Sequence, residues 1–225
     1  MLVCDLHVHT RYSRDGESSV EEILKKAEEA GLDAIAITDH DTVDGVKHAL
    51  TVPSKVLVIP GIEVSTRQGH LLVLGISEVV PAGLDVVDTV NIARGMGALL
   101  ILPHPYHIWR HGVGRKKKAG LAVVDAIEVF NSRYIVGSAN SKAARIARRM
   151  GKPCVGGSDA HNAKYVGYGR TYVDAEKNVP AILDAIRAGN VSCGGKKTPL
   201  RTYTRQSLSN TWRKIRRITR CVQLR

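Results

Sequence analysis

Seven short runs of β-branched and apolar residues recur along the chain, and each has the length of a single buried strand. Segments with the periodicity of amphipathic helices separate several of these runs. Strands that alternate with helices build mostly parallel sheets covered by helices, so the pattern predicts an α/β fold. The expected strands cover residues 2–8, 34–38, 56–59, 71–76, 98–102, 126–130 and 154–157.

Capping signals in the sequence mark both ends of the first expected helix. Ser19 and Glu22 have the spacing of a capping box, and Gly31 follows the last turn as a helix stop. Between them, apolar residues recur every three or four positions and form one face. Further helices are expected over residues 86–95, 138–150 and 178–188.

The number of strands favours a closed sheet over an open one. The chain has 225 residues, a length that suits one α/β barrel. Neither a dinucleotide-binding GxGxxG fingerprint nor a P-loop is present to support an open doubly wound sheet. We therefore expect a distorted, TIM-like (β/α)7 barrel over residues 1–195. In such barrels the active site lies at the C-terminal ends of the strands.

Most candidate metal ligands fall at these strand ends. His7 and His9 close the first run, and their spacing of two puts them on one face of a strand. A lone His-x-His pair is weak support for a metal site, and polar residues at strand ends often only satisfy loop backbone. Satisfaction of loop backbone groups accounts for one or two of these histidines but not for the whole set. Imidazole and carboxylate are, in addition, ligands of Zn²⁺, Mn²⁺ and Fe²⁺. The set comprises His7, His9, Asp15, His40, Glu63, His70, His104, Asp159 and His161.

Five motifs carry a resemblance to a known family. HVHTRYSRDG, ITDHDT, GIEVS, PHP and SDAH occur in this order and resemble the motifs of the PHP (polymerase and histidinol phosphatase) family. The resemblance implies a distorted seven-stranded barrel that holds three divalent ions. It assigns the first ion to His7, His9, Glu63 and Asp159. It assigns the second to Glu63, His104 and His70, and the third to Asp15, His40 and His161.

The expected chemistry is hydrolysis of a phosphoester. Clustered metal ions lower the pKa of a bound water and create a hydroxide nucleophile, while they neutralise the phosphoryl oxygens. Asp159 or His161 is a candidate for assisting proton transfer. Arg133 and Arg170 follow expected strands and are candidates for binding the substrate phosphate, or else are solvated loop arginines. Asp5 is a candidate acceptor that orients the ligand histidines.

Two other functions are compatible with the sequence. Amidohydrolase barrels also open with His-x-His, but Glu63 stands where those enzymes commonly use a lysine. A nucleic-acid-binding protein with a structural metal site is the non-enzymatic alternative. We expect two to three divalent ions (Zn, Mn or Fe) and a phosphatase or phosphodiesterase that acts on a phosphorylated metabolite, a nucleotide or a short oligonucleotide.

The positive charge is concentrated at the C-terminus. Ten of the lysines and arginines lie in residues 196–225, which contain no Asp or Glu, so this segment accounts for ten of the net +12. Apolar residues from Leu208 to Val222 recur at spacings of three and four, which predicts a basic amphipathic helix. Such a tail can dock on the barrel, make nonspecific contacts with nucleic acid or lie on a membrane surface. The loop over residues 104–120 is also basic. Tyr106 and Trp109 can stack on a base there while residues 115–118 contact phosphates, or else the loop is simply solvated.

The cellular location follows only by default. No stretch approaches the roughly 18 consecutive apolar residues that span a bilayer, and the N-terminus becomes polar too early for a secretory signal. A cytoplasmic location is therefore expected. The sequence leaves the oligomeric state open.

Overall fold

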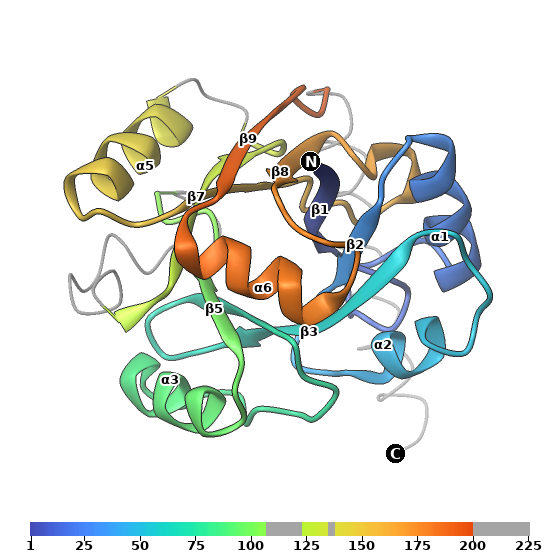
Figure 1. The fold of residues 1–225 in the computed structure, drawn as a ribbon. Coiled ribbons are helices and arrows are strands. Elements are labelled where there is room, and N and C mark those ends of the chain that lie inside the picture. Colours follow the sequence, from blue (N-terminus) through green and yellow to red (C-terminus); the bar gives the residue numbers. More distant parts are fainter. Residues whose placement is uncertain (107–122, 135–137, 200–225) are drawn as a thin grey trace, which may run out of the picture.

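A computed structural model describes residues 1–106, 123–134 and 138–199. The expectations for Trp109, for residues 115–118 and for the helix in the tail concern residues outside these ranges. Nine strands form one sheet in this part of the chain (Figure 1). They are β1 Leu2–Val8, β2 Ala34–Ile37, β3 Leu57–Ser65, β4 His70–Leu74, β5 Leu99–Leu102, β6 Ala126–Asn131, β7 Cys154–Gly157, β8 Gly169–Val173 and β9 Val191–Gly195.

The sheet curls into a nearly closed barrel. The strand order is β7-β6-β5-β4-β3-β2-β1-β8-β9. The segment after β7 returns to β1, where Val8 and Ala160 form a parallel bridge. On the edge of β7 that is not paired with β6, the backbone N–H of Gly156 donates to Oγ1 of Thr171 on β8 at 2.8 Å. The predicted α/β barrel is therefore confirmed.

Two features of the sheet differ from the sequence-based expectation. Strands β8 and β9 were not predicted, because GRTYV and VSCGG are interrupted by glycine and polar residues and are only partly buried. The sheet is also mixed, since β4 runs antiparallel to both β3 and β5. The reversal of β4 has a consequence for the site: it places the first residue of this strand, His70, at the rim where the parallel strands end.

Helices cover the outside of the barrel and one of its ends. Helices α1 (Val20–Glu29), α2 (Asp44–Ala49), α3 (Val86–Gly95) and α5 (Ser138–Arg149) surround the strands, and α6 (Val179–Ala188) lies across the barrel opening in Figure 1. Arg187 of α6 donates to the carbonyl of Gly97, just before β5, so α6 covers the N-terminal ends of the strands. The opposite end remains for the site.

The side chains form two apolar layers. The inner layer joins Leu6, Leu72 and Ile101 from the strands to Ile182 and Ile186 from α6. The outer layer lies between the strands and the surrounding helices. Both layers are almost fully buried, and burial of apolar surface stabilises a fold by roughly 25 cal/mol per Å². The two layers fix the strands that carry the rim residues.

Local signals set the helix ends as expected. The side chain of Ser19 accepts from the backbone N–H of Glu22, and the Glu22 carboxylate accepts from the N–H of Ser19, which confirms the capping box. Gly31 follows α1 with a φ of 67°. In the described ranges we find no helix with the length and apolar character needed to span a bilayer.

Candidate metal centre

His7 and His9 lie at the rim because β1 is irregular near its end. The pairing of β1 with β2 shifts register between Asp5 and Val8. Leu6 packs in the inner apolar layer, whereas Val8 packs in the outer one. The two histidines on either side of Val8 point to the same space, and their Nε2 atoms are 3.1 Å apart. Both side chains are fully buried.

The carboxylate of Glu63 lies at the centre of the cluster. Its Oε2 is 3.3 Å from Nε2 of His7, 3.2 Å from Nε2 of His9 and 3.3 Å from Nδ1 of His40. Its Oε1 is 2.9 Å from Nδ1 of His70 and 3.1 Å from Nε2 of His104. Glu63 was expected just after a strand; it lies inside β3, which extends to Ser65. One buried carboxylate therefore contacts five imidazoles, which lie at or near the ends of four strands, β1, β2, β4 and β5.

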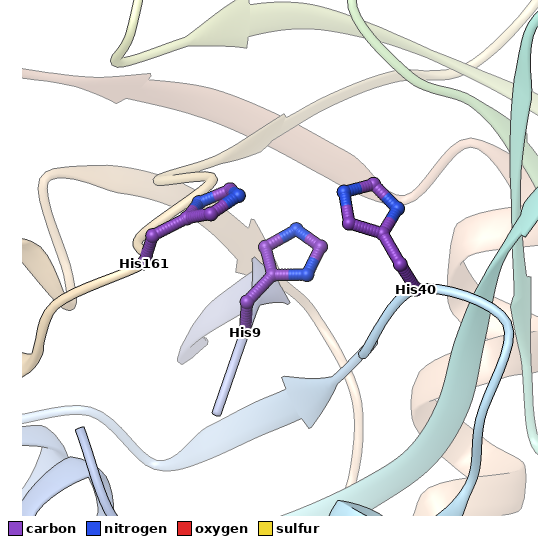
Figure 2. Close-up of side chains that lie close together, drawn as sticks. All are labelled: His9, His40 and His161. Atoms are coloured by element: carbon purple, nitrogen blue, oxygen red, sulfur yellow. The ribbon is translucent and has the colours of Figure 1, made fainter. Parts of the chain in front are cut away.

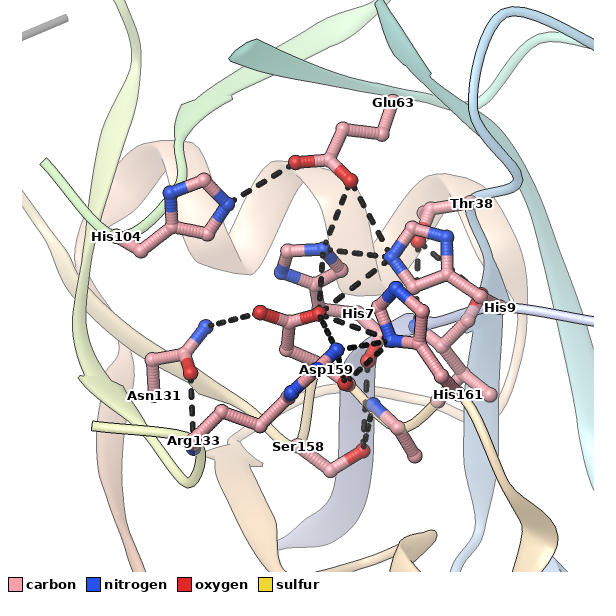
Figure 3. Close-up of polar contacts among 12 residues, drawn as sticks. His7, His9, Thr38, Glu63, His104, Asn131, Arg133, Ser158, Asp159 and His161 are labelled. Atoms are coloured by element: carbon pink, nitrogen blue, oxygen red, sulfur yellow. Dashed lines mark hydrogen bonds and ion pairs between the residues drawn. The ribbon is translucent and has the colours of Figure 1, made fainter. Parts of the chain in front are cut away.

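Asp159 and His161 reach the cluster from the loop after β7 (Figure 3). Oδ1 of Asp159 is 3.6 Å from Nε2 of His9 and 3.4 Å from Nδ1 of His161. Arg133, which follows β6, contacts both residues through Nη1, at 3.4 Å from the Asp159 carboxylate. Arg133 is buried, and it is the one permanent cation that we find against these ligands in the described ranges.

Asp15 and His40 form the more open side of the cluster. Oδ2 of Asp15 is 3.0 Å from Nε2 of His161 and 3.8 Å from Nε2 of His40. His9, His40 and His161 face a common space in Figure 2. The Asp15 side chain is 24% exposed, whereas Glu63 is only 1% exposed. Solvent therefore reaches the cluster from the side of Asp15.

Glu128 supports the site, and it was missed in the sequence analysis. Its Oε1 is 3.0 Å from Nδ1 of His7, and its Oε2 accepts from the backbone N–H of His104 and from Nδ2 of Asn131. A carboxylate on the second ring nitrogen fixes the tautomer of a ligand histidine and leaves Nε2 for the ion. A charged residue within the apolar run AIEVF was the sequence signal that could have identified Glu128.

Asp5 has a different partner set from the one expected. Its carboxylate accepts from the backbone N–H groups of Ser158 and Gly167, at 2.9 and 2.8 Å, and more weakly from the N–H of His7. No imidazole contact of Asp5 is found among the described residues. Burial raises the pKa of Asp5 to about 6. Asp5 thus ties β1 to the segments that close the barrel, while Glu128 orients His7.

Two of the rim residues have backbone conformations that side chains rarely adopt. His104 has a φ of 30° and Asp159 a φ of 52°. Such left-handed conformations of non-glycine residues cost roughly 1–3 kcal/mol each and cluster at functional sites. The fold therefore holds both side chains at the cluster at an energetic cost.

The histidines differ in their protonation. Burial and the neighbouring guanidinium of Arg133 lower the pKa of His161 to about 3, and burial holds the pKa of His40 well below its usual range. Burial also disfavours charge on His7, but Glu63, Asp159 and Glu128 together raise the pKa of His7 well above its usual range. Neutral imidazoles at His40 and His161 have the lone pair that metal binding requires. Because the pKa of His7 is raised, a metal ion would have to displace a proton from this imidazole.

The donor set fits divalent metal ions. Several groups of three side chains have ligand atoms within 4.8 Å of one another, namely His9/His40/His161, His7/His9/Glu63, His7/His104/Asp159 and His40/Glu63/His70. Nδ1 of His9 is buried and makes no hydrogen bond to the described residues. Buried carboxylates need a compensating charge, which divalent ions would supply to Asp15, Glu63 and Asp159 beyond what Arg133 provides among the described residues. Imidazole and carboxylate ligands suit Zn, Mn and Fe alike.

The remaining predicted residues lie elsewhere. Arg170 donates from Nε to the carbonyl of Gly167 and from Nη2 to the carbonyl of Ala30, on the outer side of β8, so the structure does not bring it to the cluster. Tyr106 is buried, with Nζ of Lys142 4.4 Å above its ring, and offers little open surface for stacking. All nine predicted metal ligands, by contrast, meet at one rim.

A barrel with clustered histidines and carboxylates at one rim defines a class, the metal-dependent α/β-barrel hydrolases. Residues 5–107 match the model of the PHP domain, and residues 137–191 match that of the PHP-associated region. An uncharacterized protein of Methanocaldococcus jannaschii is 34% identical over 152 residues, which are 62% of this chain and 88% of that protein. The chain belongs to the PHP family, and it is a hydrolase of the metal-dependent phosphoesterase type.

Other proteins share shorter or more distant similarity. The phosphoribosyl 1,2-cyclic phosphate 1,2-diphosphodiesterase of Eggerthella lenta is 33% identical over 54% of this chain and 45% of its own length. A two-domain protein of Bacteroides vulgatus that contains a predicted PHP-like metal-dependent phosphoesterase has a TM-score of 0.69 at 22% identity, over 87% of this chain and 65% of that one. A lesion-specific endonuclease of Pyrococcus furiosus has a TM-score of 0.67 at 18% identity, over 85% and 57%. The two structures share the fold.

Proposed function

We propose that the chain hydrolyses phosphoesters of nucleotides or short oligonucleotides, as a phosphatase or phosphodiesterase, at a site that holds two to three divalent ions. The observation that carries the proposal is the position of Glu63 between five histidines, with Arg133 beside Asp159 on the same rim. A phosphate group needs positive charge on several sides at once. Metal ions and a buried arginine supply it.

We assign the ligands to three ions. His7, His9, Glu63 and Asp159 would hold the first. Glu63, His70 and His104 would hold the second, and Asp15, His40 and His161 the third. The short distances from Glu63 to both His9 and His70 support a bridging carboxylate between the first two. The 3.0 Å distance between Asp15 and His161 supports the third set.

Divalent ions, when bound, would activate water and neutralise phosphoryl charge. The other tasks fall to side chains of the chain. Arg133 is placed to bind a phosphoryl oxygen, because its guanidinium lies beside Asp159 and His161 at the rim. Asp159 and His161 are the residues we assign to proton transfer. A pKa of about 3 keeps His161 neutral near pH 7.

The relatives support an action on phosphate esters of nucleotide type. One relative has the name of a diphosphodiesterase, and one structural neighbour that of an endonuclease. This chain spans about half the length of each of those two proteins. The particular ester is therefore part of our proposal.

The test combines metal analysis with a substrate panel. Metal content per chain is measured by mass spectrometry, and hydrolysis is measured with p-nitrophenyl phosphate, bis-p-nitrophenyl phosphate, a nucleoside 3′,5′-bisphosphate, a short oligoribonucleotide and an amide. His40→Ala is compared with His48→Ala, since His48 lies outside the cluster and contacts Glu21 instead. We expect two to three ions per chain and hydrolysis of a phosphoester that His40→Ala abolishes and His48→Ala retains.

Other results would redirect the assignment. Turnover of the amide alone would favour an amidohydrolase. Full activity in metal-free protein would contradict the proposal. Tightly bound metal without any turnover, together with binding of nucleic acid, would favour a structural metal site in a binding protein.

A further inference from the structure

A second hollow, rich in positive charge, lies on the outer side of the barrel. We call it the outer pocket; it has a volume of about 680 Å³. It lies between the end of α1, the short helix η2 (Ala163–Tyr165), β8 and the segment after β9. None of the nine proposed metal ligands lines it. The charged residues and the ring in its wall are Lys26, Glu29, Lys164, Tyr168, Arg170 and Lys196.

The outer pocket has four cationic side chains and one carboxylate. Lys26 pairs with Glu29 at 3.0 Å, so the carboxylate is already neutralised. Within the described ranges, no ion pair with a carboxylate is found for Lys164, Arg170 or Lys196. Three positive charges therefore share one hollow without compensation, and their mutual repulsion falls when an anion binds between them.

Two of these cations are held in place. Arg170 donates to the carbonyls of Gly167 and Ala30, at 2.8 and 3.0 Å, which fixes the plane of its guanidinium without neutralising its charge. Nζ of Lys196 lies 4.2 Å from the ring centre of Tyr168. Fixed cations lose little conformational freedom when a ligand binds, and a guanidinium next to lysines suits the tetrahedral oxygens of a phosphate.

Neighbouring residues connect the outer pocket with the catalytic rim. Tyr165 and Thr198 line a small space with Arg133, Asp159 and His161. Lys164 precedes Tyr165, and Lys196 stands two residues before Thr198. The same two short segments, 164–165 and 196–198, therefore border both hollows. Each segment contributes one of these residues to the outer pocket and one to the small space.

We infer that the outer pocket is a second phosphate-binding site, which holds a phosphate of the substrate other than the one that reacts. The ligand is an ester with several phosphates along a flexible backbone, such as a single-stranded oligonucleotide. The inference deepens the proposed function and rests on it for the reacting phosphate. It also gives Arg170 a role at a distance from the metal centre.

The test compares two double variants of the full-length, metal-loaded protein. Lys164→Ala/Lys196→Ala removes two cations of the outer pocket. Lys25→Ala/Lys47→Ala removes the same charge from exposed positions that do not line the pocket. Binding of a fluorescent 10-nucleotide single strand, of inorganic phosphate and of pyrophosphate is measured at several salt concentrations. Hydrolysis of bis-p-nitrophenyl phosphate serves as the readout of the metal centre.

We expect the pocket variant to bind the oligonucleotide several-fold more weakly than the control variant. The slope of log affinity against log salt should fall by about 1.4, since each lysine–phosphate contact with a single strand contributes about 0.7. Turnover of bis-p-nitrophenyl phosphate should stay unchanged. If only inorganic phosphate or pyrophosphate binding is lost, the pocket holds a free anion and the substrate assignment is overturned.

Equal oligonucleotide binding and equal salt slopes in both variants would overturn the inference as a whole. That result is distinct from failure of the proposed function, in which no phosphoester is hydrolysed by the wild-type protein. The binding comparison does not depend on turnover, so the two can be judged separately.

Discussion

Oε1 of Glu128 lies 3.0 Å from Nδ1 of His7, beneath a cluster in which Nε2 of the same ring faces the proposed ions. Both residues are almost completely buried. The contact joins the middle of β6 to the end of β1, 121 positions apart. One carboxylate thereby determines which nitrogen of His7 is presented to the site.

Replacing Glu128 with Gln should weaken metal binding while the fold is retained. The amide keeps the shape of the side chain but removes the negative charge that makes His7 a basic ligand. Loss of such a partner typically costs about 10–100-fold in metal affinity. Competition with a chelating dye measures the affinity, and Glu78→Gln on the exposed surface is the control. Unchanged affinity in Glu128→Gln would show that His7 needs no such partner.

Asp15→Asn should remove one ion and leave the others. Asp15 contacts His161 and His40 but is assigned to a different ion from His7 and His9. The amide is a poor ligand because it has no charge. Mass spectrometry of the purified variant should find one ion fewer per chain than in the wild type. Loss of every ion would mean that the three ligand sets are not independent.

In the metal-free protein, His161 should contribute a loss of stability as the pH falls from about 6.5 towards 3. Asp5 opposes this loss over part of the range, because its pKa is raised to about 6. The pKa of His161 is about 3 in the folded state and has its ordinary value near 6.5 in the unfolded chain, so between these values only the unfolded state binds the proton. Protonation then favours unfolding, with a slope of up to about 1.4 kcal/mol per pH unit for this one group. His40 contributes in the same direction.

His161→Gln tests this contribution. Urea unfolding of chelator-treated protein, measured between pH 4.5 and 7, should show a shallower loss of stability in the variant than in the wild type. His48→Gln is the control, since His48 lies outside the cluster and pairs with Glu21. A slope that is the same in all three proteins would assign the acid sensitivity to other groups.

Gly157→Ala should destabilise the fold and disturb the site together. A Cβ at this position would lie 2.5 Å from Cβ of His7 and 2.7 Å from Oε1 of Glu128. Overpacking of this kind costs typically about 1–3 kcal/mol. Thermal and urea unfolding of the metal-free variant give the free energy, and metal analysis reports on the site.

Gly95→Ala is the matched control for this change. Gly95 ends α3, and a Cβ there would have no heavy atom within 4 Å. Alanine favours the helix over glycine by roughly 0.5–1 kcal/mol, so this variant should be as stable as the wild type or more stable. Equal stability of both variants would contradict the close approach of β7 to His7.

The sequence by itself determined most of the barrel and all nine rim residues that meet in the structure. Buried parallel strands read as continuous apolar runs, and β1 and β7 have the predicted bounds. The end of a strand is a local property of the chain, so polar residues placed there, such as His40 and His104, could be recognised one by one.

What only the tertiary structure decided is which segments lie beside one another and in which direction they run. The antiparallel course of β4 brings His70 to the rim, and no local pattern in HLLVL specifies that direction. Arg170 was expected after a strand, yet it lies inside β8, and its side chain bonds to Gly167 and Ala30 and lines the outer pocket. Closure of the barrel pairs Glu128 with His7. Such contacts depend on the packing of the whole sheet, because side chains far apart in sequence meet only after the strands have been ordered.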